Sequence, residues 1–343
     1  MLSSLYALVA AARRRTYREA GRQRRLARPV ISVGNLRVGG SGKTPAVAWL
    51  ARLLADAGEK PAILSRGYAR RRPVAGVVVV SDGRQVLADL DSSGDEPLML
   101  ARAVPGVPVL VCRERFRAGV AAEQQFGTTV HLLDDGFQHL PLYRDVDLLV
   151  VSPDDVANPR TLPGGRLREP LSAAAFASAL LVPGATAAAA AQLASSLGVV
   201  AGFGLARAAE PPMQVDAGGG DVPATRDGTA FAVAGIANPD RFFRELSDGG
   251  WRVAGTMKFA DHHRYSARDV ARIMSAARAA GADAIVTTEK DLMRLLPHRP
   301  FPLTVKWVPL TVRIESADAF RDWILARLAG ARRRPGEGAE AAG

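Results

Sequence analysis

The sequence is short of cysteine and of acidic residues, and both shortages narrow what the protein can be. Cys112 is the only cysteine among 343 residues, which excludes a disulfide framework and indicates a reducing compartment. This residue ends the apolar stretch 109–112, so we expect a buried, unreactive thiol. Hydrophobic residues make up 48% of the chain. This content supports full-sized cores and argues against global disorder.

Acidic residues number 34 against 45 lysines and arginines, which leaves a net charge of +11. The surplus is not spread evenly. Residues 1–28 contain eight arginines and one glutamate and carry +7, whereas residues 29–330 carry only +3. Nucleic-acid binding would require a basic face across the fold, and the sequence does not indicate one. We therefore expect no nucleic-acid partner.

An apolar stripe lies within this basic segment, ahead of most of the arginines. Its residues recur at helical spacing: Leu2, Leu5, Tyr6, Leu8, Val9 and Ala12. The stretch is about a dozen residues long, which is too short to span a bilayer. Its charges follow the apolar run, unlike those of a secretory signal. Two interpretations fit residues 1–28 equally well: a helix lying in an anionic membrane surface, or a terminal helix packed on the protein's own core.

Residues 30–44 have the order of a phosphate-binding loop. A β-branched strand leads into a glycine-rich loop, and an apolar helix follows it. The glycines allow backbone N–H groups to point at phosphate oxygens, Lys43 would reach the β- and γ-phosphates, and Thr44 would take a Mg²⁺ position. The strict pattern has a glycine where this chain has Arg37. The order of strand, loop and helix still predicts nucleotide binding.

Strands and helices alternate through the rest of the chain, which predicts mostly parallel sheets covered by helices. The expected fold class is α/β: a P-loop NTPase-like, mostly parallel sheet domain, a second smaller α/β domain, and an N-terminal amphipathic helix. The expected divisions are the basic helix 1–28, the P-loop domain 29–209, a Pro- and Gly-rich linker 210–228, the C-terminal domain 229–330 and a disordered tail 331–343.

Acidic and histidine residues follow or precede several predicted elements. Asp134 and Asp135 end an apolar strand, where parallel sheets bind ligands and an aspartate can hold Mg²⁺; a turn-capping pair is the alternative. Asp95 stands before a helix and is either its N-cap or a general base. His262 follows a strand of the second domain and either orients a carboxylate or belongs to a solvated loop.

Seven short motifs occur in one order along the chain. They are Gly-Asn at 34–35 with Val-Gly-Gly-Ser-Gly-Lys-Thr-Pro at 38–45, Ser-Arg-Gly-Tyr at 65–68, Gly-Asp-Glu-Pro at 94–97, Leu-Asp-Asp-Gly-Phe-Gln-His at 133–139, Pro-Gly-Gly-Arg-Leu-Arg-Glu-Pro at 163–170, Phe-Ala-Asp-His at 259–262 and Thr-Glu-Lys-Asp at 288–291. In this combination the chain resembles the tetraacyldisaccharide 4'-kinase family of lipid A biosynthesis. That family also lacks the glycine that Arg37 replaces here.

The resemblance implies phosphorylation, dependent on ATP and Mg²⁺, of the 4'-hydroxyl of a tetraacylated glucosamine disaccharide 1-phosphate. It further implies two α/β domains with the active site in the cleft, and a first helix that docks on the inner leaflet. We therefore expect a peripheral enzyme on the cytoplasmic face of the bacterial inner membrane. Its partners would be the lipid substrate and anionic lipids, with no obligate protein partner.

The resemblance also assigns roles to individual residues. Catalysis is expected from Asp95 as the base, His262 as its assistant, and Lys43. Nucleotide binding is expected from Arg37, Val38, Gly39, Gly40, Ser41, Gly42, Lys43, Thr44 and Glu169. Metal binding is expected from Thr44, Asp134 and Asp135. Disaccharide binding is expected from Arg66, Tyr68, Arg115, Gln138 and His139.

Two other functions compete with this interpretation. A soluble P-loop kinase or ligase for a small metabolite would show no dependence on lipid. A regulatory nucleotide switch specific for guanine would have an Asn/Thr-Lys-X-Asp motif after a strand. Residues 288–291 place Lys290 directly before Asp291, so that base-reading motif is not evident.

Overall fold

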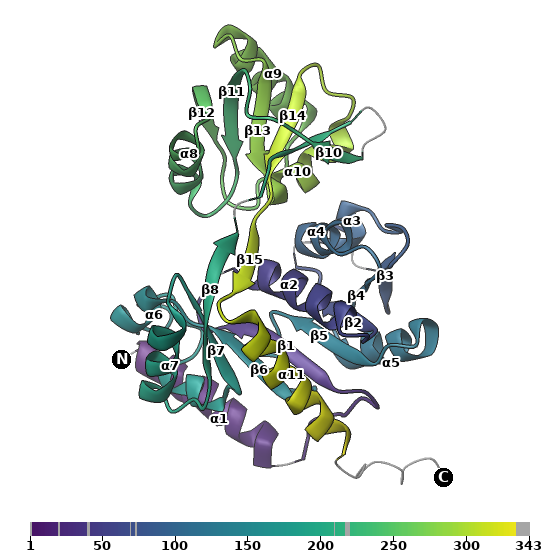
Figure 1. Cartoon of the computed structure of the whole chain (residues 1–343), viewed down its shortest axis with the longest axis vertical. Coiled ribbons are helices and arrows are strands. Elements are labelled where there is room, and N and C mark those ends of the chain that lie inside the picture. Colours follow the sequence, from purple (N-terminus) through teal and green to yellow (C-terminus); the bar gives the residue numbers. More distant parts are fainter. Residues whose placement is uncertain are drawn as a thin grey trace. The chain divides into compact units, whose positions relative to one another are not determined.

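The computed structural model describes residues 2–19, 21–39, 42–68, 70–72, 74–208, 210–216 and 220–333. The chain divides into two compact units (Figure 1). Unit 1 combines Met1–Arg207 with Val312–Gly343, and unit 2 is Ala208–Thr311. The chain therefore leaves the first unit once and returns to it.

The described part of unit 1 is built on a nine-stranded sheet with the order β15-β8-β7-β6-β1-β5-β2-β4-β3. Its strands are β1 (Val30–Asn35), β2 (Pro61–Ser65), β3 (Val78–Asp82), β4 (Pro108–Val111), β5 (Val130–Asp134), β6 (Val146–Val150), β7 (Ala179–Pro183), β8 (Gly202–Ala208) and β15 (Thr311–Ile314). β1 lies parallel between β5 and β6, and β2 lies parallel between β5 and β4, whereas β3 runs antiparallel to β4. The expected mostly parallel sheet is confirmed.

Helices cover this sheet because its central strands have no solvent-facing side. Every residue of β1, β2, β5 and β6 is buried, which explains why these strands are nearly continuous apolar runs in the sequence. The helices of the unit are α1 (Leu2–Glu19), α2 (Lys43–Asp56), α3 (Leu90–Ser93), α4 (Asp95–Ala103), α5 (Arg115–Phe126), α6 (Pro153–Ala157), the 3₁₀ helix η1 (Leu171–Phe176), α7 (Ala187–Ser196) and α11 (Ala317–Arg332).

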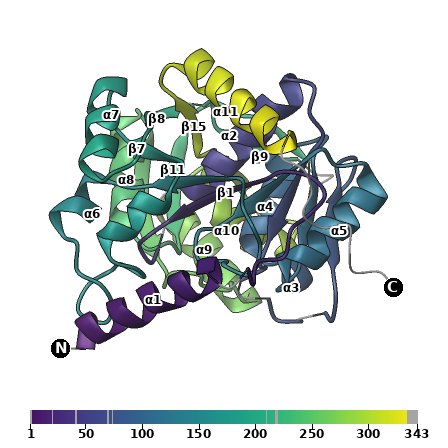
Figure 2. The same cartoon turned by 90° about the horizontal axis from the view of Figure 1, so that it is seen from below.

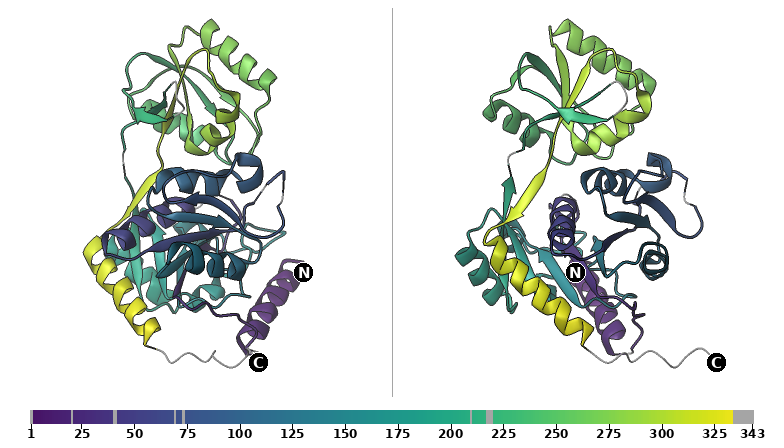
Figure 3. Two further views of the ribbon diagram at one scale, coloured as in Figure 1. Left: turned by 90° about the vertical axis from the view of Figure 1, so that its right-hand side faces the viewer. Right: turned by 45° about the vertical axis from the view of Figure 1, so that its right-hand side comes forward.

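Helix α11 belongs to unit 1, and this corrects the expected C-terminal boundary at residue 330. The ring of Phe320 lies 5.5 Å from that of Trp49 on α2 and 4.9 Å from that of Phe203 on β8. Phe320 is fully buried there. Figure 3 shows this yellow helix alongside the strands of unit 1. Aromatic burial therefore ties the end of the described chain to the first unit.

The described part of unit 2 contains a six-stranded sheet with the order β10-β9-β14-β13-β11-β12. The strands are β9 (Met213–Val215), β10 (Asp221–Pro223), β11 (Thr229–Ala234), β12 (Arg252–Lys258), β13 (Ala284–Thr288) and β14 (Thr304–Val308). The helices are α8 (Pro239–Asp248), α9 (Ala267–Ala279), α10 (Glu289–Leu295) and the 3₁₀ helix η2 (Leu296–His298). The four strands β12, β11, β13 and β14 are parallel, and β9 and β10 add antiparallel pairs at one side.

The expected linker at 210–228 also needs correction. Its described residues include β9 and β10, which pair with each other and, through β9, with β14 of the unit 2 sheet. The second unit consequently begins at Ala208 rather than at residue 229. Of the expected tail 331–343, α11 includes Arg332, and residues 334–343 lie outside the described residues.

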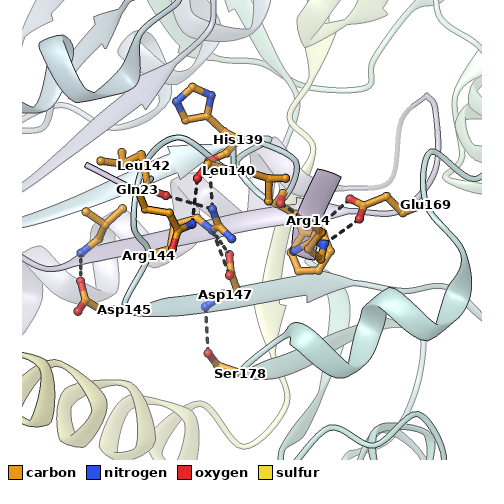
Figure 4. A network of polar contacts seen from close by, with 12 residues as sticks. Arg14, Gln23, His139, Leu140, Leu142, Arg144, Asp145, Asp147, Glu169 and Ser178 are labelled. Carbon is orange, nitrogen blue, oxygen red and sulfur yellow. Dashed lines mark hydrogen bonds and ion pairs between the residues drawn. The ribbon is translucent and has the colours of Figure 1, made fainter. Parts of the chain in front are cut away.

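Helix α1 is mostly exposed but has one buried anchor, Arg14. Figure 2 shows the helix in purple at the periphery of unit 1. The Arg14 guanidinium donates to both carboxylate oxygens of Glu169, at 2.8 Å each, and to the carbonyl of Phe137 at 3.2 Å (Figure 4). It also lies over the Phe137 ring, 4.2 Å from the centroid. A buried, bidentate ion pair thus fixes the helix to the core of unit 1.

We predict that Arg14→Met weakens the attachment of α1 by about 3 kcal/mol, because it leaves the Glu169 carboxylate buried without its cation. Native-state amide hydrogen exchange of residues 2–19 and 160–170 would measure the loss. The matched control is Arg13→Met, since Arg13 is exposed on the same helix. Equal exchange rates in the two variants would contradict an anchoring role.

Candidate active site

The glycine-rich loop connects β1 to α2, as the sequence predicts. Gly42 is the N-cap of α2 and has the left-handed angles φ 83° and ψ 13°, and Gly39 also has a positive φ of 98°. Glycine adopts these angles at little cost. Gly40 and Ser41 lie outside the described residues. The first N–H groups of α2 have no partners within the helix and supply the local geometry of an anion site.

Lys43 bridges the carboxyl ends of two adjacent strands. Its Nζ donates to Asn35 Oδ1 at 2.9 Å and lies 3.4 Å from Asp135 Oδ1. Asn35 ends β1, and Asp135 follows the last residue of β5. The two strands pair in parallel, so their carboxyl ends meet at one edge of the sheet, where ligands bind in such folds. The structure thus brings Lys43 to Asp135, and the expected roles of Lys43 in phosphate binding and of the Asp134–Asp135 pair in metal binding stay predictions.

The Asp135 carboxyl favours its ionised form, although its side chain is only 34% exposed. Desolvation favours the protonated form, but the nearby charges of Lys43 and Arg168 outweigh it and hold the pKa of this carboxyl below its ordinary value. Arg168 Nη1 donates to Asp135 Oδ2 at 2.8 Å and to Gln138 Oε1 at 3.3 Å. Gln138 in turn donates to the carbonyl of Asn35 at 2.9 Å. These contacts fix the loop after β5 against the end of β1.

Residues 166–168 form a second support for the phosphate-binding loop. Val38 N donates to the carbonyl of Arg166 at 2.8 Å, and Arg168 N donates to the carbonyl of Leu36 at 2.5 Å. The Arg37 side chain is directed to α6, where its Nη1 lies 3.4 Å from Asp155 Oδ1. The neighbouring Glu169 holds Arg14 of α1. In this structure the Glu169 carboxylate is occupied by the ion pair with Arg14. The expected contact of Glu169 with the nucleotide stays a prediction.

Asp95 is the first residue of α4 and is buried. Its Oδ1 accepts from the backbone N–H of Glu96 at 2.9 Å. Gly94 has φ 87°, and a Cβ placed on it would lie 2.6 Å from the carbonyl oxygen of Tyr68. Glycine is therefore required for the loop that carries Asp95 to approach the loop that carries Arg66 and Tyr68. The Tyr68 side chain itself is exposed.

Arg115 and Arg144 form a cationic cluster around the partly buried His139. Arg115 Nη1 lies 3.3 Å from His139 Nδ1, and Arg115 Nε has no hydrogen-bond partner in the described part of the chain. Burial, followed by the charge of Arg66, lowers the pKa of Arg115 to about 10. Arg144 is held by Asp147 and donates to the carbonyl of His139 (Figure 4). Such a cluster suits an anionic group of a ligand.

His262 belongs to unit 2, whereas Asp95 belongs to unit 1. The expected assistance of Asp95 by His262 therefore stays a prediction. His262 has a left-handed φ of 57°, and its Nδ1 lies 3.3 Å from Arg294 Nη2. In the described residues no group of three or more His, Cys, Asp or Glu side chains could hold a metal ion by itself.

Three residues of this site received no role from the sequence: Arg14, Asn35 and Arg168. Asn35 ends a strand that is followed directly by the glycine-rich loop, and Arg168 lies in the motif at 163–170. The positions of these two residues in the sequence could therefore have indicated a role in the site. Arg14 is one of eight arginines in a basic segment. Nothing in the sequence of this segment distinguishes Arg14, which is buried, from the other arginines.

Comparisons with known proteins point to one family, and the matches cover nearly the whole chain. The family model described as tetraacyldisaccharide-1-P 4'-kinase (LpxK) matches residues 1–329. A tetraacyldisaccharide 4'-kinase of Geobacter metallireducens is 42% identical over 305 residues, which are 87% of this chain and 88% of that protein. One of Geobacter sulfurreducens is 40% identical over 299 residues, covering 86% and 83%. A crystal structure described as the "apo" form of LpxK from Aquifex aeolicus in complex with ATP has a TM-score of 0.76 and 29% identity, covering 95% of this chain and 97% of that one.

We predict that acid destabilises unit 1 partly through His139. Burial, and then the charges of Arg115, Arg144 and Arg66, lower its pKa to about 3. Because the unfolded chain takes up this proton near its ordinary pKa of about 6.5, stability falls as the pH drops from about 6.5 towards 3. Urea unfolding of wild type and His139→Gln across this range would measure the effect. The variant should lose less stability, and parallel pH profiles would contradict the prediction.

Proposed function

The chain belongs to the tetraacyldisaccharide 4'-kinase family, and we infer from this membership that it transfers the γ-phosphate of ATP to the 4'-hydroxyl of tetraacyldisaccharide 1-phosphate in lipid A biosynthesis. The observation that carries the inference is that the family match spans residues 1–329, and so includes both units. The described arrangement of Lys43 at the edge of a parallel sheet supplies the phosphate-binding chemistry that this reaction needs.

Lys43 and the N-terminus of α2 would hold the phosphates of ATP. The polyphosphate carries several negative charges, so it would compete with Asp135 for the Lys43 ammonium. Asn35 Oδ1, which accepts from Lys43 at 2.9 Å, would keep the side chain at the mouth of the loop. Lys43 would then neutralise charge that develops on the transferred phosphoryl group, where electrostatic stabilisation contributes most of the catalysis.

The oxygen ligands present at this edge of the sheet fit Mg²⁺. Thr44 is the second residue of α2 and Asp134 ends β5, and both are buried, while Lys43 and Arg168 hold the pKa of Asp135 below its ordinary value. Mg²⁺ takes hard oxygen ligands and is commonly held by one or two carboxylates plus substrate phosphates. We therefore assign its binding to Thr44, Asp134 and Asp135. When bound, the ion would neutralise the β- and γ-phosphate oxygens.

Asp95 is the proposed general base. A carboxylate at this position would accept the proton of the attacking sugar hydroxyl as the new P–O bond forms. The loop that carries Asp95 lies against the loop of Arg66 and Tyr68, which we assign with Arg115, Gln138 and His139 to the disaccharide. The buried guanidinium of Arg115 suits an anionic substrate. His262 would assist the base.

Helix α1 is proposed to rest on the cytoplasmic leaflet of the inner membrane. Its apolar side chains are exposed on the protein: Leu2, Leu5, Tyr6, Leu8 and Val9. Arginines follow them and suit anionic headgroups. None of the described helices combines the length and the apolar character needed to cross a bilayer. A surface position would give the enzyme access to a substrate whose acyl chains are buried in the membrane.

We predict that purified protein transfers ³²P from [γ-³²P]ATP to tetraacyldisaccharide 1-phosphate, and that Asp95→Asn lowers kcat by about 100-fold or more while KM for ATP stays near its wild-type value. The amide keeps the size of the carboxylate but cannot accept the proton. Thin-layer separation of the labelled lipid would measure transfer.

Lys43→Ala is the comparison for this experiment, because it removes the phosphate contact and should reduce transition-state stabilisation directly. Absence of labelled lipid with the wild-type protein would contradict the proposed function. A near-normal kcat for Asp95→Asn would exclude Asp95 as the base and leave the overall reaction in place.

We predict that the protein cosediments with vesicles containing phosphatidylglycerol, and that the double substitution Leu5→Asp with Leu8→Asp lowers this binding at least about 10-fold through lost apolar burial. The matched control is Val200→Asp, since Val200 is the most exposed large apolar residue described and does not belong to α1. Wild-type protein that stays in the supernatant would contradict the membrane proposal.

A further inference from the structure

A buried polar cluster in unit 2 lies next to His262. It is built around Asp291 and Arg294 of α10, of which Asp291 has no exposed surface and Arg294 is 3% exposed. Asp291 is the last residue of the motif at 288–291, which had no assigned role in the sequence. Buried charges are retained only where they are paired and hydrogen-bonded, so the contacts of this pair show what it holds in place.

The Asp291 carboxylate is surrounded by four donors. Oδ2 accepts from the backbone N–H of Gly235 at 3.0 Å and from Thr288 Oγ1 at 2.7 Å. Oδ1 accepts from Tyr265 Oη at 2.9 Å and from Arg294 Nη1 at 3.2 Å. Burial, and then the charge of Asp291, raise the pKa of Tyr265, which keeps its hydroxyl a donor. The carboxylate is therefore fixed on several sides, and it fixes the Arg294 guanidinium in turn.

Arg294 faces the histidine from this fixed position. Its Nη1 also donates to the carbonyl of Gly235 at 2.9 Å, and its Nη2 lies 3.3 Å from His262 Nδ1. The same Gly235 carbonyl accepts from the backbone N–H of His262 at 3.2 Å. A guanidinium has donors and no acceptor. Nδ1 of His262 can make this contact only as an acceptor, that is, without a proton.

We propose that Arg294 is a positioning residue that holds His262 as the neutral tautomer with its proton on Nε2. The functional consequence rests on the proposed role of His262 as assistant to the general base. In this tautomer Nε2–H can donate to a carboxylate or phosphate oxygen and cannot take up a proton. His262 therefore orients an anionic partner by hydrogen bonding, and the base itself retains the substrate proton. A group bound to one ring nitrogen commonly selects the tautomer in this way.

The first test reads the tautomer directly. Protein labelled with ¹⁵N-histidine would give the protonation of each ring nitrogen by long-range ¹H–¹⁵N spectroscopy, with His262→Gln used to assign the signals. We expect His262 to carry its proton on Nε2 in the wild type and in Arg294→Lys, because the ammonium is also a pure donor. In Arg294→Met, which keeps an unbranched side chain without donors, Nδ1–H should become populated. A proton on Nδ1 in the wild type would overturn the proposal.

The second test measures lipid phosphorylation in the full-length variants. Arg294→Met should lower kcat by about 10- to 100-fold, as loss of an outer-shell orienting group commonly does, with KM for ATP unchanged because the nucleotide contacts lie in unit 1. Arg294→Lys should recover part of the loss. Arg278→Met is the matched control, since Arg278 is exposed on α9 of the same unit, and it should keep wild-type kcat.

The outcomes separate the inference from the function on which it rests. Full activity in His262→Gln would overturn the assisting role of His262, whichever tautomer is found. Loss of activity in His262→Gln together with unchanged tautomer and kcat in Arg294→Met would overturn the role of Arg294 alone. Should Arg294→Met fail to fold, the wild-type spectrum and the Arg294→Lys variant still decide between the two tautomers.

Discussion

The contact of Lys43 with Asn35 and Asp135 is the interaction on which the candidate site depends. It joins the glycine-rich loop to the carboxyl ends of β1 and β5, so one ammonium group links three chain segments. The partners are a neutral amide and a carboxylate that Arg168 also holds. An incoming polyphosphate could therefore exchange with Asp135 while the amide contact is kept. The site is positioned before ligand arrives, which reduces the ordering cost of binding.

The segment 160–170 connects this site to the first helix. Its backbone pairs with Leu36 and Val38 next to the glycine-rich loop, and its Glu169 carboxylate holds Arg14 of α1. Thr161 also donates to the carbonyl of Ser3 at 2.9 Å. The segment 160–170 thus supports both the helix with an exposed apolar face and the glycine-rich loop that we propose to bind phosphate.

Local pattern predicted the elements well, and non-local contacts account for the differences. The strand before the glycine-rich loop and the acidic pair at the carboxyl end of β5 were both found where the apolar runs place them. Propensity failed within 210–228, where proline and glycine suggested a linker but β9 pairs with β14 and β10 pairs with β9. The domain assignment of α11 was also wrong, because the return of the chain to unit 1 depends on the contacts of Phe320 with Trp49 and Phe203. Such contacts leave no periodic trace in the sequence.

Backbone strain gives a separate indication of where function lies. Among the described residues, those other than glycine with positive φ are Asp135, His262 and Ser316. Left-handed angles are uncommon outside glycine, although Asp and His tolerate them better than most residues, and such residues persist only where surrounding contacts hold them. Ser316 is explained by the start of α11, for which it is the N-cap. Asp135 is held by Lys43 and Arg168, and His262 by Gly235 and Arg294. In both cases the contacts orient a polar side chain and do not fill a hydrophobic core. This arrangement is expected of residues that have a chemical role.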